Sequence, residues 1–94
     1  MVNIMNKNEQ PVCQTDEKGN KYWYLNDQLH RIDGPAIEHA DGSRTWFVNG
    51  QRHRENGPAM ESSNGSKGWW YHGKPIYCFS QEEFERLIKL IFLF

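Results

Sequence analysis

The chain has 94 residues, with 11 Lys+Arg against 12 Asp+Glu and a formal net charge of −1. This length fits one domain and excludes a catalytic domain joined to a regulatory one. The balanced charge excludes a general nucleic-acid-binding protein, which needs a strongly basic surface. Aromatic residues make up 14% of the chain, so we expect a thin core of large flat side chains.

The N-terminal segment, residues 1–10, is expected to be a tail or a short strand of a single domain that spans residues 1–94. It lacks the long apolar region of a signal peptide, and the chain has no stretch of about 18 apolar residues. We therefore expect a cytoplasmic protein. Cys13 and Cys78 are too few and too far apart for a disulfide scaffold and are expected to be free thiols.

A repeat of 23 residues organises residues 11–78. Equivalent positions hold Gly19, Gly42 and Gly65, and also Trp23, Trp46 and Trp69. Two complete units carry His-Arg-x-x-Gly-Pro-Ala at residues 30–36 and 53–59, each followed by a glutamate at 38 or 61. The third unit stops matching at residue 75, as a terminal capping repeat does.

Turn signals follow one another about every eight residues within this region. Asn-Gly and Asp-Gly pairs tolerate the positive φ angles of two-residue type I′ loops, so short strands between them predict an antiparallel meander. The fold class is therefore mainly β, an antiparallel β-hairpin meander with one C-terminal helix. The expected strands cover residues 12–16, 21–25, 28–31, 36–40, 43–48, 51–54, 59–63, 66–71 and 74–78.

The final segment, residues 80–93, changes to a helical period. Ser80 and Glu83 form a capping-box pattern, and the acidic residues favour a helix N-terminus. Phe84, Leu87, Ile88 and Ile91 follow the spacing of one apolar helix face, which other apolar residues widen.

Two-residue loops at 26–27, 41–42, 49–50, 64–65 and 72–73, with four-residue loops at 32–35 and 55–58, predict which side chains share a face of the sheet. One face is expected to form the core, covered by the helix, in a row of cross-strand neighbours. In order across the sheet these are Trp23, His30, Ile37, Trp46, His53, Met60, Trp69 and Ile76.

The opposite face is expected to mix aromatic and charged side chains, with Arg52 directly opposite Glu61. An ordinary solvated face is the alternative, but exposed aromatic and Arg residues together are typical of binding hot spots. The candidate binding residues are Tyr24, Phe47, Trp70, Arg31, Arg52 and Arg54. Arg31 and Arg54 have a structural alternative, since they can pair with Asp33, Glu38, Glu55 or Glu61 inside the repeat.

Catalytic and metal sites are not expected. His30 and His53 recur because the repeat recurs, and no Cys-x-x-Cys, His-x-His or His-Glu-x-x-His spacing is present. The Gly-Pro turns are unlike phosphate loops, since proline lacks the N–H that such a loop donates. No Gly-x-Ser-x-Gly motif occurs, and Glu82 and Glu83 are explained by helix capping. We therefore predict a non-enzymatic protein without a cofactor or metal.

The units around Trp23, Trp46 and Trp69 resemble MORN-type repeats, in particular a short variant with an aromatic pair before Asn-Gly-Lys/Gln. The His-Arg-x-x-Gly-Pro-Ala extension is similar to repeats of small accessory proteins of bacteria and tailed bacteriophages. The resemblance covers about residues 17–78 and implies a sheet of repeated hairpins that binds a protein or ligand without catalysis. It departs from the usual MORN unit because Gly-Pro-Ala replaces the Gly-rich second half, so a lipid-binding role does not carry over.

The functional hypothesis is a phage- or prophage-encoded inhibitor or modulator that binds a protein of the bacterial host, of an anti-defence type, in the host cytoplasm. One alternative is a protein that sequesters a nucleotide or another small anionic ligand between aromatic rings and Arg. Another is an oligomeric structural module. Separately, the apolar helix predicts a homodimer, with contacts through Leu90, Ile91, Phe92 and Phe94.

Overall fold

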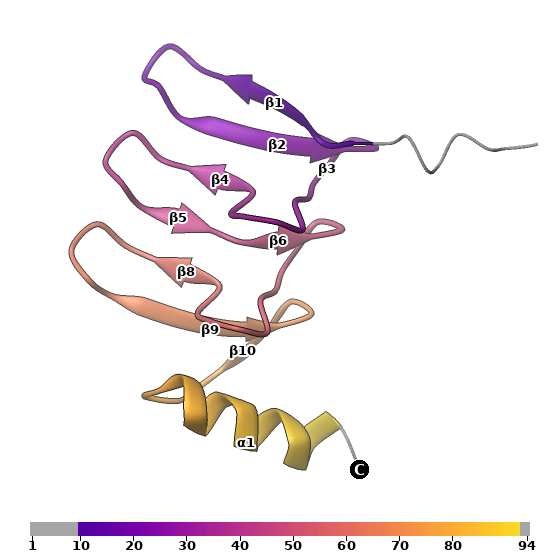
Figure 1. The fold of residues 1–94 in the computed structure, drawn as a ribbon, viewed down its shortest axis with the longest axis vertical. Helices are drawn as coiled ribbons and strands as arrows, with labels where there is room; N and C mark the ends of the chain where they lie inside the picture. The colour runs from indigo at the N-terminus through magenta and orange to yellow at the C-terminus, as the bar shows by residue number, and fades with distance from the viewer. Residues whose placement is uncertain (1–9, 93–94) are drawn as a thin grey trace, which may run out of the picture.

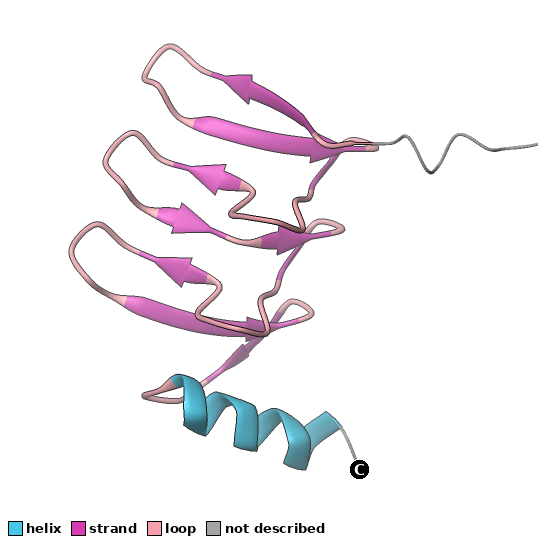
Figure 2. Cartoon of the chain, viewed as in Figure 1, coloured by secondary structure: helices cyan, strands magenta, loops and turns pink. Residues whose placement is uncertain are grey.

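The computed structural model describes residues 10–92, and Figure 1 shows a stack of three hairpin tiers closed at one end by a helix. The mainly β fold with one C-terminal helix is confirmed, and Figure 2 shows its strands separated by loops of similar shape in each tier. The elements are β1 Val12–Thr15, β2 Lys21–Leu25, β3 Gln28–Leu29, β4 Ile37–Glu38, β5 Arg44–Thr45, β6 Phe47–Val48, β7 Gln51–Arg52, β8 Met60–Glu61, β9 Lys67–Tyr71, β10 Lys74–Ile76 and α1 Gln81–Phe92.

Two kinds of turn alternate along the chain. The pairs 26–27, 49–50 and 72–73 have positive φ at both residues, from 48° at His72 to 85° at Gly73, which is the predicted type I′ geometry. At the other edge of the stack, only the glycine of each loop has positive φ. There Gly42 N–H donates to His39 O, and His39 N–H donates to Ser43 O, so residues 40–42 form the loop. The prediction of a two-residue loop at 41–42 is wrong, and so is that at 64–65, where Ser62 and Ser66 bond in the same way.

The longer loops shift the register of the strands that follow. Ile37 lies opposite Thr45 instead of Trp46, and Met60 lies opposite Gly68 instead of Trp69. A shift of one residue moves a side chain to the other face of a sheet. Ile37 and Met60 therefore leave the predicted row of core residues, and Glu38 and Glu61 join the face that holds the tryptophans.

Several predicted strand partners are also wrong. The segments after His30 and His53 do not continue as strands, because the Gly-Pro turns break the backbone ladder and proline donates no hydrogen bond. Consequently β4 returns to pair with β2, and β8 pairs with β5. The prediction placed Ile37 opposite His30, Met60 opposite His53 and Glu61 opposite Arg52. In the structure, Ile37 lies opposite Tyr22, Met60 opposite Thr45 and Glu61 opposite Arg44. The pairing of β6 with β7 and of β9 with β10 follows the predicted register.

The molecule is thin, with extents of 41 × 39 × 16 Å. Its larger sheet has the order β1-β2-β4-β5-β8-β9-β10 with β3 also paired to β2, and β6 and β7 form a separate two-stranded sheet. Its side chains form two faces. We call the face that holds Trp23, Trp46 and Trp69 the Trp face, and the opposite one, which holds Tyr24, Phe47 and Trp70, the ladder face. No helix within residues 10–92 is long and apolar enough to cross a membrane.

The helix α1 closes the last tier and does not cover the whole Trp face as predicted (Figure 1). Its Phe84 and Ile88 pack with Trp69 and Ile76, and Phe84 is fully buried. Ser80 caps the helix as predicted, with its Oγ accepting from Glu83 N–H at 3.1 Å, while Glu83 Oε1 accepts from Phe79 N–H instead of from Ser80. Ile91, expected on the buried face, is 52% exposed, whereas Phe92 beside it packs against Tyr71 of β9.

Candidate interaction surface

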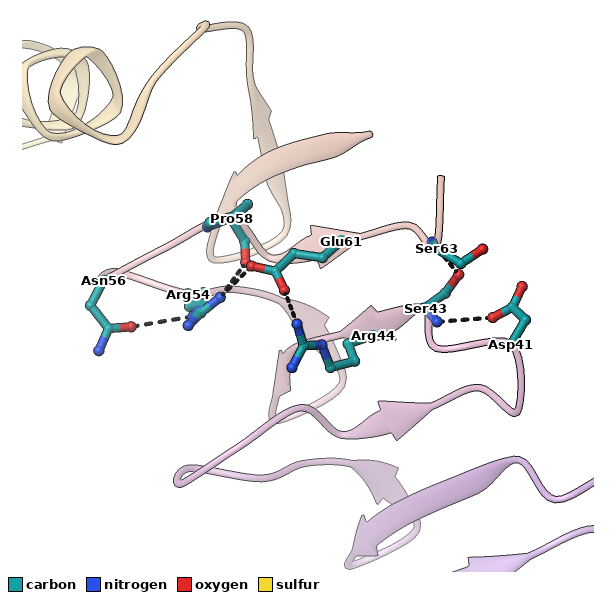
Figure 3. Close-up of polar contacts among 8 residues, drawn as sticks. All are labelled: Asp41, Ser43, Arg44, Arg54, Asn56, Pro58, Glu61 and Ser63. Carbon is teal, nitrogen blue, oxygen red and sulfur yellow. Dashed lines mark hydrogen bonds and ion pairs between the residues drawn. The ribbon is translucent and has the colours of Figure 1, made fainter. Parts of the chain in front are cut away.

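The Trp face holds Arg54 in a closed set of contacts (Figure 3). Its guanidinium carbon lies 3.8 Å from the centre of a Trp46 ring. Nη1 donates to Pro58 O at 3.0 Å and to Glu61 Oε2 at 3.3 Å, and Nε donates to Asn56 Oδ1 at 3.3 Å. We call this arrangement the Arg clasp. A planar guanidinium with fixed donors suits both the stacking and the paired oxygens.

Gly57 completes the Arg clasp. A Cβ atom on Gly57 would lie 2.6 Å from the guanidinium carbon of Arg54, which is closer than real Cβ contacts allow. The following Pro58 orients its carbonyl toward Arg54, and Ala59 is fully buried beneath. The Gly-Pro-Ala motif is therefore explained by packing around one arginine.

The first repeat contains the same Arg clasp. Arg31 lies 3.9 Å from a Trp23 ring centre and donates to Pro35 O at 3.1 Å, and Gly34 leaves it space in the same way. It also pairs with Asp33 and Glu38 at 3.3 Å. The structural alternative for Arg31 and Arg54 is thus confirmed, except that Glu55 pairs with His53. Their predicted location beside Phe47 and Trp70 is wrong, because both guanidinium groups lie over tryptophans of the Trp face.

Glu61 joins two tiers. Its Oε1 accepts from Arg44 Nη2 at 2.8 Å, while its Oε2 accepts from Arg54 Nη1 (Figure 3). The register shift that brought Glu61 to the Trp face makes both contacts possible. Next to this cluster, Ser63 N–H donates to Ser43 Oγ at 3.0 Å and links neighbouring loops of the stack.

His53 also joins two tiers and is buried, with 8% of its surface exposed. Its Nδ1 accepts from His72 N–H at 2.8 Å, as His30 Nδ1 accepts from Asn49 N–H at 2.9 Å in the preceding unit. Burial, followed by the neighbouring His72, lowers the pKa of His53 below its ordinary value of 6.5. The recurrence of this histidine is therefore explained by a recurring hydrogen bond.

His53, Glu55 and His72 bring donor atoms of metal-binding types within 4.8 Å of one another. Because His53 Nδ1 accepts a backbone N–H, the neutral ring carries its proton on Nε2, 3.3 Å from Glu55 Oε2. A metal on Nε2 would move that proton to Nδ1, where it would face the N–H of His72. The chemistry of this group therefore favours a hydrogen-bond network over a metal centre.

On the ladder face, equivalent positions of successive tiers hold Tyr24, Phe47 and Trp70, which we call the aromatic ladder. Arg52 lies directly opposite Phe47 across β6 and β7, and its guanidinium carbon is 5.5 Å from the Phe47 ring centre and 5.3 Å from that of Trp70. Arg52 is exposed and forms no salt bridge with any residue that the structure describes. Three of the predicted binding residues, Phe47, Arg52 and Trp70, therefore lie together, and Tyr24 occupies the equivalent position of the first tier.

Sequence reasoning missed the role of Gly68. A Cβ atom there would lie 2.5 Å from the Trp70 ring, so glycine lets this ring lie flat on the sheet. The signal was available, because Gly68 occupies the position of Tyr22 and Thr45 in the other units. Glycine replaces the larger side chain in the same tier that carries the largest ring of the aromatic ladder, Trp70.

The Trp face carries a depression of about 720 Å³ between the two Gly-Pro turns, lined in part by Arg31, Trp46, His53 and Arg54. Nη1 of each arginine already donates to a proline carbonyl and to a glutamate carboxylate. Because Glu38 and Glu61 already neutralise these arginines, the depression is less positively charged than two free arginines would make it.

The two cysteines lie at opposite ends of the stack, Cys13 opposite Trp23 across β1 and β2 and Cys78 against the cluster that contains Trp69. Cys13 is exposed, Cys78 is half-buried, and both are free thiols as predicted. Burial raises the pKa of the Cys78 thiol, so this sulfur is a poor nucleophile at neutral pH.

In comparisons with known proteins, no protein-family model, curated protein or solved structure matches this chain. The resemblance to MORN-type repeats accordingly rests on the repeated residues alone.

Proposed function

We propose that this chain is a non-enzymatic protein-binding module whose contact surface is the aromatic ladder together with Arg52. The observation that carries the proposal is the contrast among the arginines. Arg31 and Arg54 are enclosed by the Arg clasp, whereas Arg52 lies between two rings and has no carboxylate partner within residues 10–92. An exposed cation flanked by aromatic rings is the composition of an interaction hot spot.

The shape of the ladder face supports a macromolecular partner. The rings of Phe47 and Trp70 lie on either side of Arg52 on the ladder face, whereas the depression of about 720 Å³ is lined by Trp46 and His53 of the Trp face. A series of rings across strands presents a broad platform, and its rigid side chains lose little entropy on binding. The partner class implied by the resemblance to phage accessory repeats is a protein of a bacterial host, which this chain would inhibit or modulate in the host cytoplasm.

The test is affinity capture from a bacterial lysate with the immobilised chain, followed by mass spectrometry and binding measurements with the purified partner. Phe47→Ala, Arg52→Ala and Trp70→Ala should each weaken binding at least about tenfold, as hot-spot truncations do. Matched controls are Phe79→Ala and Arg86→Ala, which remove the same residue types from exposed positions outside the ladder. Unchanged capture by all three ladder variants, with circular dichroism showing an intact fold, contradicts the proposal.

A small anionic ligand is the second candidate, and the depression on the Trp face is the observation in its favour. A ligand held there would stabilise the folded chain, so linear and cyclic nucleotides should raise the melting temperature without any protein partner. If none does so at millimolar concentration, this candidate fails.

A homodimer through α1 is a separate proposal. Leu90 is 72% exposed and Ile91 is 52% exposed on the side of the helix that the sheet does not cover. Phe92 is half-buried, and Phe94 lies outside the described residues. Sedimentation should give a dimer mass for the full chain and a monomer mass for the double variant Leu90→Glu/Ile91→Glu; a monomer mass for the full chain refutes it.

A further inference from the structure

The spacing of the aromatic ladder is set by the sheet. One strand lies between each ring and the next. β3 pairs with β2, and the N–H of Arg31 just after β3 donates to Phe47 O; β7 pairs with β6, and the N–H of Arg54 just after β7 donates to Trp70 O. Equivalent positions are therefore two strands apart. Neighbouring strands lie about 4.8 Å apart, which gives a rise of about 9.6 Å from one ring to the next. A partner that contacts all three rings in the same way must repeat at this distance.

Among regular backbone conformations, polyproline II repeats closest to this distance. It rises about 3.1 Å per residue with three residues per turn, so every third residue recurs after about 9.3 Å. Two turns of an α-helix span about 10.8 Å, and two residues of a β-strand span about 6.7 Å. Over the two steps from Tyr24 to Trp70 the polyproline II mismatch stays below about 1 Å, whereas that of the helix exceeds about 2 Å.

The charge of the ladder specifies the partner further. Arg52 lies between Phe47 and Trp70 and has no carboxylate partner among the described residues, whereas the equivalent position of the preceding unit, between Tyr24 and Phe47, holds Leu29. One end of the ladder is therefore apolar and the other is cationic. A complementary segment needs an apolar contact at one end and a carboxylate at the other.

We propose that the aromatic ladder binds an extended, proline-rich segment of its partner in the polyproline II conformation, with an acidic residue placed against Arg52. This inference rests on the proposed function and names the chemistry of the partner. Aromatic rings are the usual surface for such segments, whose preformed backbone loses little entropy on docking. The acidic side chain sets the direction in which the segment lies along the stack.

The experiment uses the full chain and blocked synthetic peptides, with binding followed by NMR shifts of backbone amides in β6, β7 and β9. The probe is a peptide of repeating Pro-Pro-Glu with three repeats. The controls are Pro-Pro-Lys peptides of the same length, which reverse the charge, and Gly-Ser-Glu peptides, which keep the charge but not the conformation. We expect the Pro-Pro-Glu peptide to bind at least about fivefold more tightly than either control.

The variant Arg52→Glu should reverse the preference between the Glu and Lys peptides, while Arg86→Glu should leave it unchanged. Equal binding of the proline-rich and Gly-Ser peptides, or an unchanged preference in Arg52→Glu, overturns the inference. Its failure is distinguishable from that of the proposed function: if ladder variants still lose the lysate partner while no peptide preference is found, only the polyproline II inference fails. Normal capture by the ladder variants refutes both.

Discussion

The Trp face and the ladder face use the same residue types for different purposes. On the Trp face, every arginine of a Gly-Pro motif stacks on a tryptophan and pairs with a glutamate of its own repeat. On the ladder face, Arg52 lies between two aromatic rings and pairs with no glutamate among residues 10–92. Stacking on an aromatic ring is therefore common to all three arginines, and the internal carboxylate is what separates Arg31 and Arg54 from Arg52.

The strongest way to break this comparison is to remove one ring from each face. Trp46 is 9% exposed, so Trp46→Ala should lower the free energy of unfolding by about 3–5 kcal/mol through the cavity that it leaves. Phe47→Ala, one residue away on the half-buried face, should cost less than half as much. Urea denaturation followed by circular dichroism measures both. Equal losses would mean that the ladder face is part of the core.

The arginines give the next largest contrast. Arg54→Lys removes a planar guanidinium that stacks on Trp46 and donates to Pro58 and Glu61, so it should cost about 1–3 kcal/mol of stability. Arg52→Lys should change stability by no more than about 0.5 kcal/mol, as is usual for exposed positions. The same denaturation experiment compares the two. If Arg52→Lys lowered the stability more than Arg54→Lys, Arg52 and not Arg54 would be the structural arginine.

Gly57→Ala tests the Arg clasp without removing its charges. Its added Cβ would lie 2.6 Å from the Arg54 guanidinium, so the side chain must shift, at a cost of about 1–2 kcal/mol. Gly57 has no positive φ, and backbone strain therefore does not contribute. In the double variant Gly57→Ala/Arg54→Ala the alanine at 57 should add little further loss; additive losses would show that Gly57 acts independently of the clasp.

The smallest effect is expected from pH and concerns the Trp face alone. The pKa of His53 is lowered in the folded chain, so the unfolded chain binds the proton first as the pH falls. Stability should be complete above the ordinary pKa of 6.5 and should decrease as the pH falls from there toward the lower folded value. Protonation of Nδ1 would also oppose the N–H of His72. The variant His53→Gln should show a flatter decrease in thermal melts between pH 7 and pH 5, and an unchanged slope would exclude His53 as the cause.

Much of the local structure could be predicted from single residues. The type I′ turns follow from Asn-Gly and similar pairs, and the helix cap follows from Ser80 and Glu83. The loops at 40–42 and 63–65 could not be predicted in the same way, because a glycine after Asp or Asn suits both a two-residue loop and a longer loop with one left-handed glycine. That single-residue difference decided on which face Glu38 and Glu61 lie.

By itself, the sequence determined the 23-residue repeat, the hairpins, the final helix and the equivalence of Tyr24, Phe47 and Trp70, because these depend on local backbone preferences and on the spacing of identical residues. Only the tertiary structure decided that Arg31 and Arg54 are enclosed while Arg52 is not. The strand partners of β4 and β8 and the pairing of Arg44 with Glu61 are contacts between residues distant in the chain. Such contacts depend on strand register. A loop that is longer by one residue shifts the register by one residue and moves the side chains of the following strand to the other face.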